Sequence, residues 1–304
     1  MQNITSNEEL MLSNIAQFES VNIEYHESIP AVKIFEEIKN AEARPFVKWV
    51  GGKRSLSKAI SLRTPTSFND YYEPFLGGGA IFFKLQPRRA FISDLNLDLI
   101  ITYTIVRDEP LELMKILSRQ KANHCKDYYY AIRQNSNSSN PVEIAARFIY
   151  LNKTCFNGLH RVNSKGEFNV PIGSYINPNI LDEENIIGCS NALKNADIKY
   201  QDFIDITPKA KDFIYFDPPY QPIKHDSFTR YTKSDFTQVE QVKLFEKCIE
   251  LDRQGVYFLL SNSDSELIKE LYRDFTIDTV NAPRTINCKV GSRQGASEVL
   301  IRNY

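Results

Sequence analysis

The sequence of 304 residues has room for one large catalytic domain with a sizeable insertion, or for two modest domains. Hydrophobic residues make up 42% and charged residues 25%, as is usual for a soluble globular protein. No apolar run is long enough to span a bilayer and no secretory signal is evident, so we expect a cytoplasmic protein without a membrane partner.

Residues 1–44 differ from the rest of the chain in charge, with eight glutamates against three basic residues. Pro30 interrupts this stretch, and an amphipathic helix is expected between residues 31 and 43. The remainder has a mild basic excess, which is compatible with nucleic-acid binding but does not demonstrate it. We therefore treat residues 1–44 as an N-terminal extension that either docks on the body or serves as an oligomer contact.

The chain contains five cysteines: Cys125, Cys155, Cys189, Cys248 and Cys288. Their number is odd, their spacing is wide and no two have the Cys-x-x-Cys spacing, while the four histidines are scattered. We therefore expect reduced thiols, with neither a disulfide framework nor a zinc or other metal site.

From Pro45 the sequence alternates between strand and helix patterns. Residues 71–75 predict a short strand, followed by the glycine turn of residues 77–79 and a helical run at residues 80–85. Residues 90–94 predict the next strand, which ends in an acid. A strand, a glycine turn, a helix, a strand and an acid in this order form half of a nucleotide-binding α/β unit.

Beyond this unit the pattern changes and then returns. Residues 97–153 have apolar residues at helical spacing, whereas residues 154–175 consist of short alternating pieces separated by glycine, asparagine and proline, which predicts a hairpin. A further helix is expected at residues 237–253. Further strands are predicted at residues 197–200, 212–217 and 256–260, and within 276–304 around a Gly/Ser/Arg loop at 291–295. We therefore expect an α/β sheet domain interrupted by a helical insertion that carries a hairpin.

The glycine turn and Asp94 fit a nucleoside ligand. Glycines let the backbone approach a ligand closely because no Cβ intrudes, and an acid at the end of the next strand can accept hydrogen bonds from ribose hydroxyls. The run Gly-Gly-Gly differs from G-x-G-x-x-G, so a dinucleotide is less favoured. Taken alone, the glycines fit a tight structural turn and Asp94 fits a helix cap. Their combination favours the nucleoside.

The motif Asp217-Pro218-Pro219-Tyr220 directly follows an apolar strand. Two successive prolines cannot continue a helix or the hydrogen bonds of a strand, so the chain leaves the sheet in an extended form. The Asp217 carboxylate and the Pro218 carbonyl can then point at one spot. These two acceptors match the two N–H donors of an exocyclic amine, and Tyr220 offers a face for a flat base. The plain alternative is a proline-rich loop that merely ends a strand, and the glycine turn upstream weighs against it.

This set of groups suits methyl transfer to an amine. The adenine amine is a poor nucleophile because its lone pair is delocalised into the ring. Hydrogen bonds from both N–H groups localise the lone pair, so in-line attack on a sulfonium methyl needs mainly positioning and no metal. The base must first leave the stack.

Several segments match one known family. They are residues 46–53 (FVKWVGGK), 73–79 (EPFLGGG), 94–96 (DLN), 156–163 (FNGLHRVN), 166–173 (GEFNVPIG) and 217–220 (DPPY). From Pro45 to the C-terminus the sequence resembles the Dam family of DNA adenine-N6 methyltransferases, in the α group of the D12 class, which includes GATC-type enzymes. Each motif alone would be a weak signal, and the set is specific.

The resemblance implies a Rossmann-like, S-adenosylmethionine-dependent methyltransferase sheet with an inserted helical target-recognition domain that carries a β-hairpin. The catalytic domain would comprise residues 45–103 and 181–304, and the insertion residues 104–180. The implied reaction transfers a methyl group from S-adenosylmethionine to N6 of adenine in double-stranded DNA, with GATC as the expected site. Base flipping and direct in-line transfer are implied, without a metal.

The resemblance also assigns residues to the cofactor and to catalysis. Trp49 and Lys53 would line the cofactor site, Asp94 would contact the ribose, and Asp202 and Phe203 would contact the cofactor adenine. The full cofactor set is Trp49, Lys53, Phe75, Gly77, Gly79, Asp94, Asp202, Phe203 and Asp217, and the catalytic set is Asp217, Pro218, Pro219 and Tyr220. The alternatives are a core role for Trp49, a solvated side chain for Lys53 and a strand-end cap for Asp202.

The insertion would read DNA, and Arg161 matches the family's guanine-recognising arginine. A bidentate contact to guanine O6 and N7 is worth roughly 1–3 kcal/mol of discrimination. The full DNA-binding set is Lys48 and Tyr175 near the outer base pair, Phe156, Asn157 and Leu159 at the opened stack, Pro171 on a base, Arg161, and Arg133 as a phosphate contact. Arg161 could instead be a solvated hairpin arginine, and Phe156 and Leu159 could form a local core. Ser174 stands where some relatives carry arginine, so one DNA contact would be missing.

Two other functions compete with an adenine methylase. One is methylation of another amino group, on N4 of cytosine or on RNA, and the aspartate at position 217 argues against it. The other is a catalytically inactive DNA-binding subunit, which the intact motifs disfavour. A restriction endonuclease of the same system is the expected protein partner if the enzyme is not solitary.

Overall fold

The computed structural model describes residues 42–136, 138–220, 236–282 and 296–304. The chain before residue 42, the loop at residues 291–295 and Cys288 lie outside the described residues. The expectations for the N-terminal extension, its amphipathic helix and this loop therefore stay predictions.

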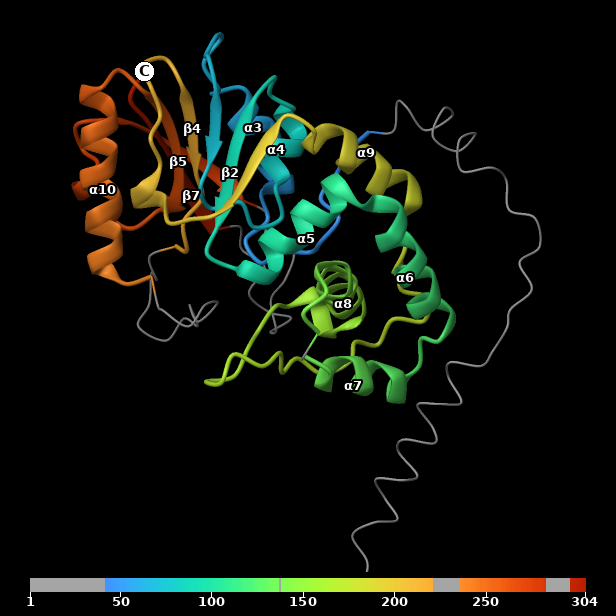
Figure 1. Ribbon diagram of the computed structural model, residues 1–304. Coiled ribbons are helices and arrows are strands. Elements are labelled where there is room, and N and C mark those ends of the chain that lie inside the picture. The colour runs from blue at the N-terminus through green and yellow to red at the C-terminus, as the bar shows by residue number, and fades with distance from the viewer. Residues whose placement is uncertain (1–41, 137, 221–235, 283–295) are drawn as a thin grey trace, which may run out of the picture. The chain divides into compact units, whose positions relative to one another are not determined.

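A seven-stranded sheet forms the centre of the described structure (Figure 1). Its strands are β1 (Tyr71–Glu73), β2 (Ala90–Asp94), β3 (Ala196–Tyr200), β4 (Phe213–Phe216), β5 (Tyr257–Ser263), β6 (Thr276–Ala282) and β7 (Ala296–Arg302). Their order is β3-β2-β1-β4-β5-β7-β6, and β7 runs antiparallel to both of its neighbours. The other neighbouring pairs are parallel. This arrangement confirms the predicted Rossmann-like α/β fold.

Both faces of the sheet are buried, which explains why its central strands are continuous apolar runs in the sequence. In β4, Phe213 and Tyr215 belong to one hydrophobic core, whereas Ile214 and Phe216 belong to the other. Side chains alternate between the two faces of a strand, so each apolar residue of this strand stabilises one of two separate helix layers.

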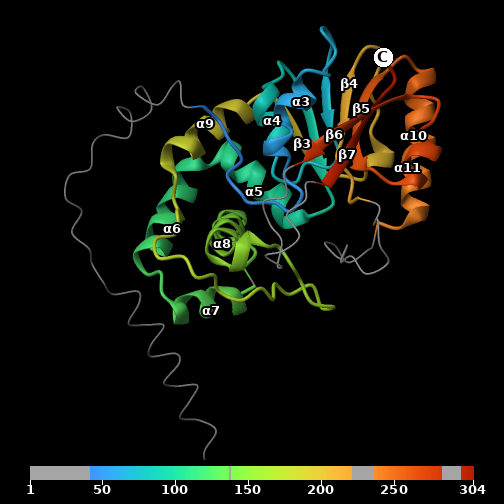
Figure 2. The same cartoon turned by 180° about the vertical axis from the view of Figure 1, so that it is seen from behind.

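Helices form those two layers (Figures 1 and 2). Helices α3 (Ser57–Ser61), α4 (Ala80–Leu85), α5 (Leu97–Asp108) and α9 (Glu183–Leu193) contribute to one core. Helices α10 (Gln238–Arg253) and α11 (Glu266–Leu271) contribute to the other. A short 3-10 turn, η1 (Lys53–Ser55), precedes α3, and another, η3 (Phe203–Asp205), lies between β3 and β4 along the chain.

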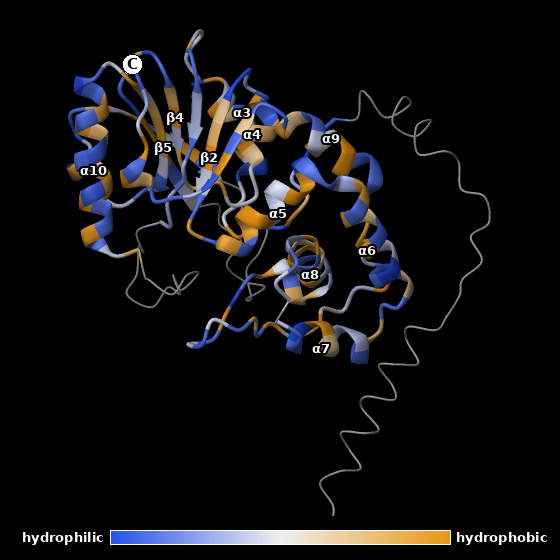
Figure 3. Ribbon diagram, in the orientation of Figure 1, coloured by the Kyte–Doolittle hydropathy of each residue, from blue (hydrophilic) through white to orange (hydrophobic). Residues whose placement is uncertain are grey.

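Helix α10 follows the predicted boundaries closely. Thr237 caps it in a reciprocal capping box with Glu240, which satisfies backbone N–H groups that would otherwise lack partners. Its buried side chains include Leu244, Cys248 and Leu251, at helical spacing. Hydrophilic and hydrophobic colours accordingly alternate along α10 in Figure 3.

Between β2 and β3 the chain is helical, as predicted. After α5 come α6 (Pro110–Ala122), α7 (Lys126–Gln134) and α8 (Pro141–Thr154), and α9 then leads back to the sheet. Both α6 and α8 begin with proline, whose fixed φ suits the first position of a helix. Helix α8 packs against α5, α6 and α7, so α5 joins this helical group to the sheet layer.

The predicted hairpin is an irregular arm, which we define as residues 155–172. Antiparallel bridges join Cys155 to Ile172 and Val162 to Phe168, with the 3-10 turn η2 (Phe156–Gly158) near one end. The arm leaves α8 and returns beside α7 (Figures 1 and 2). Its described residues form no extended strand, and Tyr129 and Arg133 of α7 donate to the carbonyl of Val170 and hold it to the helices.

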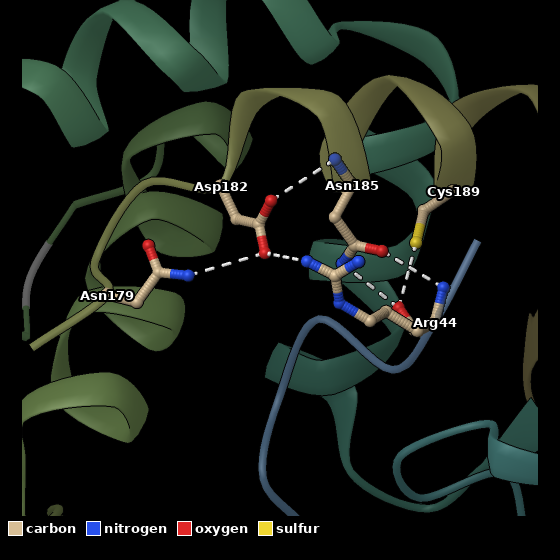
Figure 4. A network of polar contacts seen from close by, with 5 residues as sticks. All are labelled: Arg44, Asn179, Asp182, Asn185 and Cys189. Atoms are coloured by element: carbon tan, nitrogen blue, oxygen red, sulfur yellow. Dashed lines mark hydrogen bonds and ion pairs between the residues drawn. The ribbon is translucent and has the colours of Figure 1, made fainter. Parts of the chain in front are cut away.

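The chain at Arg44 is fixed to α9 by a polar network (Figure 4). The buried amide of Asn185 accepts from the backbone N–H of Arg44 at 3.0 Å and donates to its carbonyl at 3.0 Å. Cys189 donates to the same carbonyl, and the Arg44 guanidinium pairs with Asp182 at 2.6 Å. These contacts fix the chain just before residues 46–53, which contribute side chains to the site below.

Candidate active site

Two carboxyl groups lie at the point where the strand order of the sheet reverses. The chain crosses from β1 to β2 on one side, and β4 pairs with the other edge of β1. In open α/β sheets, ligands bind outside the carboxyl ends of the strands at such a point. Glu73 is the last residue of β1, and Asp217 directly follows β4.

Asp217 forms an ion pair with Lys53. The Nζ of Lys53 lies 2.8 Å from Asp217 Oδ1 and donates to the carbonyl of Gly51 at 2.6 Å. Burial raises the pKa of Asp217 to about 6, while Lys53 acts to lower it. Asp217 is therefore mainly ionised at neutral pH and accepts hydrogen bonds only. Lys53 is only 5% exposed, so the alternative of a solvated lysine is wrong.

The two prolines of the motif differ in how their carbonyls are used. Gln241 of α10 donates to the carbonyl of Pro219 at 3.0 Å, and Asn262 of β5 donates to Gln241 at 3.0 Å. No described residue donates to the carbonyl of Pro218. The buried amides thus fix the loop while leaving the Pro218 carbonyl available beside Asp217.

Tyr220 has one partner at its hydroxyl and another over its ring. Its hydroxyl donates to Glu298 Oε2 of β7 at 2.6 Å, and Lys53 Nζ lies 4.6 Å from its ring centroid. Burial, followed by the nearby carboxylates of Asp217 and Glu298, raises the pKa of the phenol well above its usual range. Tyr220 therefore stays neutral and remains a donor. Glu298 belongs to no local sequence motif, and no role was predicted for it.

Glu73 is the second residue whose part in the site was missed. It is 2% exposed, and the hydroxyl of Tyr71 donates to its Oε2 at 2.7 Å. Burial raises the pKa of Glu73 to about 8, with a further contribution from Asp217. Glu73 is therefore mostly a neutral carboxylic acid at pH 7. Its position before the glycine turn was visible in the sequence, but its burial was not.

The glycine turn is required by the packing of two aromatic rings. Gly77 and Gly79 have φ angles of 47° and 65°, in the left-handed region that favours glycine. A Cβ on Gly77 would lie 2.6 Å from the Trp49 ring, and one on Gly79 would lie 2.6 Å from the Tyr103 hydroxyl. Glycine at these positions thus serves a structural need in addition to any approach by a ligand.

Asp94 fastens the glycine turn to β2. One carboxylate oxygen accepts from the backbone N–H of Gly77 at 2.9 Å, and the other accepts from that of Asn96 at 2.9 Å. The cap of α5 is Asn96, so the alternative that Asp94 caps this helix is wrong. Each oxygen of a carboxylate has more than one lone pair, and capacity for hydroxyl donors therefore remains.

Three residues predicted to bind the cofactor lie together. The rings of Phe75 and Phe203 stack with centroids 5.3 Å apart, and both contact Phe236. Asp202 directly precedes Phe203 in the sequence. Its side chain accepts from the backbone N–H of Ile204 at 3.1 Å and so caps η3. The capping alternative for Asp202 is therefore present in the structure, and it leaves the second carboxylate oxygen for another donor.

Trp49 connects the glycine turn to the helical group. Its half-buried ring stacks on Phe148 of α8 and on His160 of the arm, with centroids 6.3 and 5.6 Å away. Burial lowers the pKa of His160 to about 4, so this ring is neutral at physiological pH. The core alternative for Trp49 is thus partly realised.

Lys48 and Tyr175 lie together at the exposed base of the arm. Lys48 Nζ donates to the Tyr175 hydroxyl at 3.0 Å and lies 4.2 Å from its ring centroid. The buried side chain of Asn152 accepts from the backbone N–H of Lys48 and donates to the carbonyls of Lys48 and Gly158. Asn152, which no motif marked, therefore joins the start of the body to the arm.

The residues predicted to lie at an opened base stack or against a base fall into two groups. Phe156, Asn157 and Pro171 are exposed, and the backbone N–H of Phe156 donates to the carbonyl of Pro171 at 2.9 Å. Asn157 has a φ of 55°, so the turn displays it in a left-handed conformation. Leu159 is partly buried against the hydrophobic core. The local-core alternative therefore describes Leu159, and it does not describe Phe156.

The two arginines predicted to contact DNA use part of their donors internally. The exposed Arg161 donates from Nε to the Asn169 side chain at 2.7 Å, across the arm. Arg133 donates to the carbonyl of Val170 at 3.2 Å and lies over the ring of Tyr130 at 4.7 Å. Each guanidinium has five N–H donors, so both keep donors for a further partner.

Comparison with known proteins decides between the competing functions. Residues 49–286 match the family described as D12 class N6 adenine-specific DNA methyltransferase. The chain belongs to this family. The methyltransferase is therefore an enzyme that acts on the N6 amine of adenine in DNA, and the cytosine, RNA and inactive-subunit alternatives are set aside.

Individual relatives agree with this assignment. The chain is 43% identical to the Type II methyltransferase M1.LlaDCHI of Lactococcus lactis subsp. cremoris, over 86% of this chain and 95% of the relative. It is 42% identical to the Type II methyltransferase M.MjaIII of Methanocaldococcus jannaschii, over 86% and 100%. It is 34% identical to the DNA adenine methylase of Escherichia coli strain K12, over 84% and 94%.

The methyl donor of this family is S-adenosylmethionine, and the site suits its positive charge. Among the residues that the structure describes, the carboxylates of Asp217 and Glu298 lie near one cation, Lys53. A site with an excess of carboxylate favours a sulfonium ion. The remaining acceptor capacity of Asp94, at the carboxyl end of β2, suits ribose hydroxyls.

Three further findings concern the described residues alone. No group of three or more histidine, cysteine, aspartate or glutamate side chains among them is placed to hold a metal ion. The four cysteines within them are free thiols. None of the helices described is both long enough and apolar enough to cross a membrane.

Proposed function

We propose that the enzyme methylates adenine within GATC, after rotating the base out of the duplex, by direct in-line transfer. The observation that carries this proposal is the pair of available acceptors, Asp217 and the Pro218 carbonyl, beside the ring of Tyr220. An exocyclic amine donates two hydrogen bonds, and this pair accepts two. Tyr220 supplies the face on which the extruded base stacks.

The chain's own groups then carry out positioning and proton handling. Asp217 and the Pro218 carbonyl accept from the amine and turn the nitrogen lone pair toward the methyl carbon. S-adenosylmethionine, when bound, supplies an electrophilic methyl group. A proton leaves the amine during the reaction, and the carboxylate of Asp217, with a pKa of about 6, can hold it before solvent takes it.

The cofactor would be held along the carboxyl ends of β1 and β2. We assign the methionine end to the region of Trp49, Lys53 and the glycine turn, and the ribose to Asp94. The aromatic pair of Phe75 and Phe203, preceded by Asp202, would contact the adenine. The stacked rings provide an apolar wall for a flat base, and the acid beside them provides an acceptor for an amine.

DNA recognition would belong to the insertion, residues 104–180, within a catalytic domain of residues 45–103 and 181–304. Arg161 would read a guanine, with Phe156 and Asn157 at the opened stack and Pro171 against a base. Leu159 would border the stack from its core position. Lys48 and Tyr175 would lie near the outer base pair, and Arg133 would contact a phosphate. GATC rests on the resemblance of the arm sequence to GATC-type enzymes, and relatives named DNA adenine methylase support adenine as the target base.

Sequencing of modified bases tests the proposal. DNA from cells that lack other methyltransferases and express this protein should carry N6-methyladenine at GATC. The matched control is the Asp217→Ala variant, which should leave the same sites unmodified. Methylated adenine in a different sequence would refute the proposed specificity.

We further propose that the enzyme protects DNA from a restriction endonuclease of the same system. Two of the relatives are named Type II methyltransferases. Extracts of the source cells should then cut unmethylated DNA at the site that this enzyme modifies, and should leave DNA that it has methylated intact. Equal stability of both DNAs in such extracts would favour a solitary enzyme.

A further inference from the structure

The hydroxyl of Tyr220 has a partner that comes from the far end of the chain. It donates to Glu298 Oε2 at 2.6 Å, across a separation of 78 residues. Charge-assisted hydrogen bonds of this kind are roughly twice as strong as neutral ones. A contact between a catalytic-loop residue and a distant strand restrains the loop in a way that local sequence cannot.

The topology of the sheet explains how Glu298 reaches the site. Strand β7 is antiparallel to β5, and Glu298 is paired with Ser263, the last residue of β5. The start of β7 therefore lies at the carboxyl edge of the parallel strands, where Asp217 follows β4. Glu298 shares a face of β7 with Leu300, which belongs to the same core as Tyr215.

Tyr220 is thus restrained at three points. Gln241 holds the carbonyl of the preceding residue, Lys53 lies over the ring, and Glu298 holds the hydroxyl. The first two contacts limit the backbone and one face of the ring. Among the described residues, Glu298 thereby fixes where the hydroxyl end of the ring lies.

We propose that Glu298 is a positioning residue that fixes the hydroxyl end of the Tyr220 ring, and through the place of that ring the orientation of the target adenine. This inference rests on the proposed stacking role of Tyr220. A misplacement of reacting groups by about 1 Å can lower a rate by about 100-fold. A loosened Tyr220 should therefore slow methyl transfer while leaving the DNA-binding surface of the arm intact.

The charge of Glu298 provides a second readout, which a merely structural residue would lack. Its carboxylate opposes ionisation of Asp217 and so acts to raise the pKa of that group. Glu298→Gln keeps an oxygen that accepts from Tyr220 but removes the charge. The acid limb of the rate profile should then move to lower pH, whereas Glu298→Ala should lose the hydrogen bond as well.

The test compares full-length wild type with Glu298→Ala, Glu298→Gln, Tyr220→Phe and the double variant Tyr220→Phe/Glu298→Ala. We expect Glu298→Ala and Tyr220→Phe each to lower kcat by about 10- to 100-fold with little change in KM for DNA. The double variant should be no slower than the slower single variant, because each single change already removes the bond between Tyr220 and Glu298. At saturating S-adenosylmethionine, Glu298→Gln should turn over faster than Glu298→Ala, with the acid limb displaced.

Two outcomes would overturn the inference: Glu298→Ala turning over within about twofold of wild type, or losses that multiply in the double variant. Thermal unfolding and DNA binding serve as fold controls, with the exposed Glu266→Ala as the matched variant. Should Glu298→Ala not fold, Tyr220→Phe and Glu298→Gln still test both predictions. Asp217→Ala separates the proposals, because its full activity would refute the proposed function, whereas its inactivity beside an active Glu298→Ala refutes only this inference.

Discussion

The catalytic edge of the sheet and the arm hold their functional side chains in different ways. At the edge, Lys53, Asp217 and Glu298 are far apart in sequence and meet through close polar contacts with Tyr220. In the arm, Arg161 is exposed, and its partner Asn169 lies eight residues away. The edge joins its functional side chains to one another across the sheet, whereas the arm is anchored to the body through residues such as Trp49 and Asn152 and leaves Arg161 exposed.

This difference follows from what each region must do. A reacting amine has to meet acceptors that are already in place, because reorganisation during the reaction would raise the barrier. Contacts to DNA are completed by the partner, so side chains in the arm can keep unused donors and exposed faces. We therefore expect substitutions at the edge to change turnover or stability, and substitutions in the arm to change selectivity.

The largest effect is expected for stability at Glu73, on the edge. Its pKa is 4.5 when unperturbed and about 8 in the folded protein. The folded state thus keeps a proton that the unfolded state loses, so the contribution of Glu73 to stability is fully present below pH 4.5 and is lost as the pH rises toward 8. Between these values the free energy of unfolding should fall by roughly 1.4 kcal/mol per pH unit as the pH rises.

Glu73→Gln isolates this contribution, because an amide still accepts from Tyr71 but does not ionise. Urea unfolding at several pH values from 5 to 8 should show the two proteins diverging, with the variant relatively more stable at the alkaline end. Parallel curves for the two proteins would mean that Glu73 ionises normally in the fold.

The next effect concerns turnover at Asp217. Removal of a preorganised group that stabilises a transition state lowers kcat by roughly 100- to 1,000-fold, and we expect Asp217→Ala to fall in this range. DNA binding, measured by fluorescence anisotropy, should remain. In the wild type, kcat should decline below pH 6 as Asp217 is protonated and loses an acceptor site. Turnover within a few-fold of wild type would remove Asp217 from the catalytic set.

The sequence predicted those parts of the catalytic edge in which a recognisable motif directly follows a strand. The positions of β2, α4 and β4 followed from apolar periodicity, and the parallel order then brings the ends of β1 and β4 together. The ion pair of Lys53 with Asp217 was not predicted, although the resemblance placed both in one site. Pair geometry depends on distances across the sheet, which no spacing along the chain encodes.

The residues that were missed are those placed by long-range packing. Glu298 lies in β7, and its role follows only from the antiparallel insertion of that strand between β5 and β6. Gln241 is fully buried in α10 and holds the Pro219 carbonyl, although its position in the helix resembles any polar one. The pattern of a sequence shows which faces are buried, but it does not show which polar groups meet there.

A smaller effect is expected in the arm, at Arg161. Loss of a bidentate contact to guanine should relax preference at one base pair by roughly 1–3 kcal/mol. Arg161→Ala should therefore methylate sites altered at that guanine more readily, relative to the intact site, with an unchanged thermal midpoint. Competition assays with one substituted base pair at a time measure this. A uniform loss on all sequences would instead identify a phosphate contact.

The smallest effect on stability is expected at Phe156, and Leu159 provides the comparison within the same arm. Phe156 is 45% exposed, so Phe156→Ala should change the free energy of unfolding by less than about 0.5 kcal/mol. Leu159 packs on the core, so Leu159→Ala should destabilise by roughly 1–2 kcal/mol. With 2-aminopurine at the target position, Phe156→Ala should reduce the fluorescence gain that reports an extruded base. If Phe156→Ala destabilised the protein as much as Leu159→Ala, Phe156 would belong to a local core. The exposed ring of Phe156 would then serve the packing of the arm and not contact with DNA.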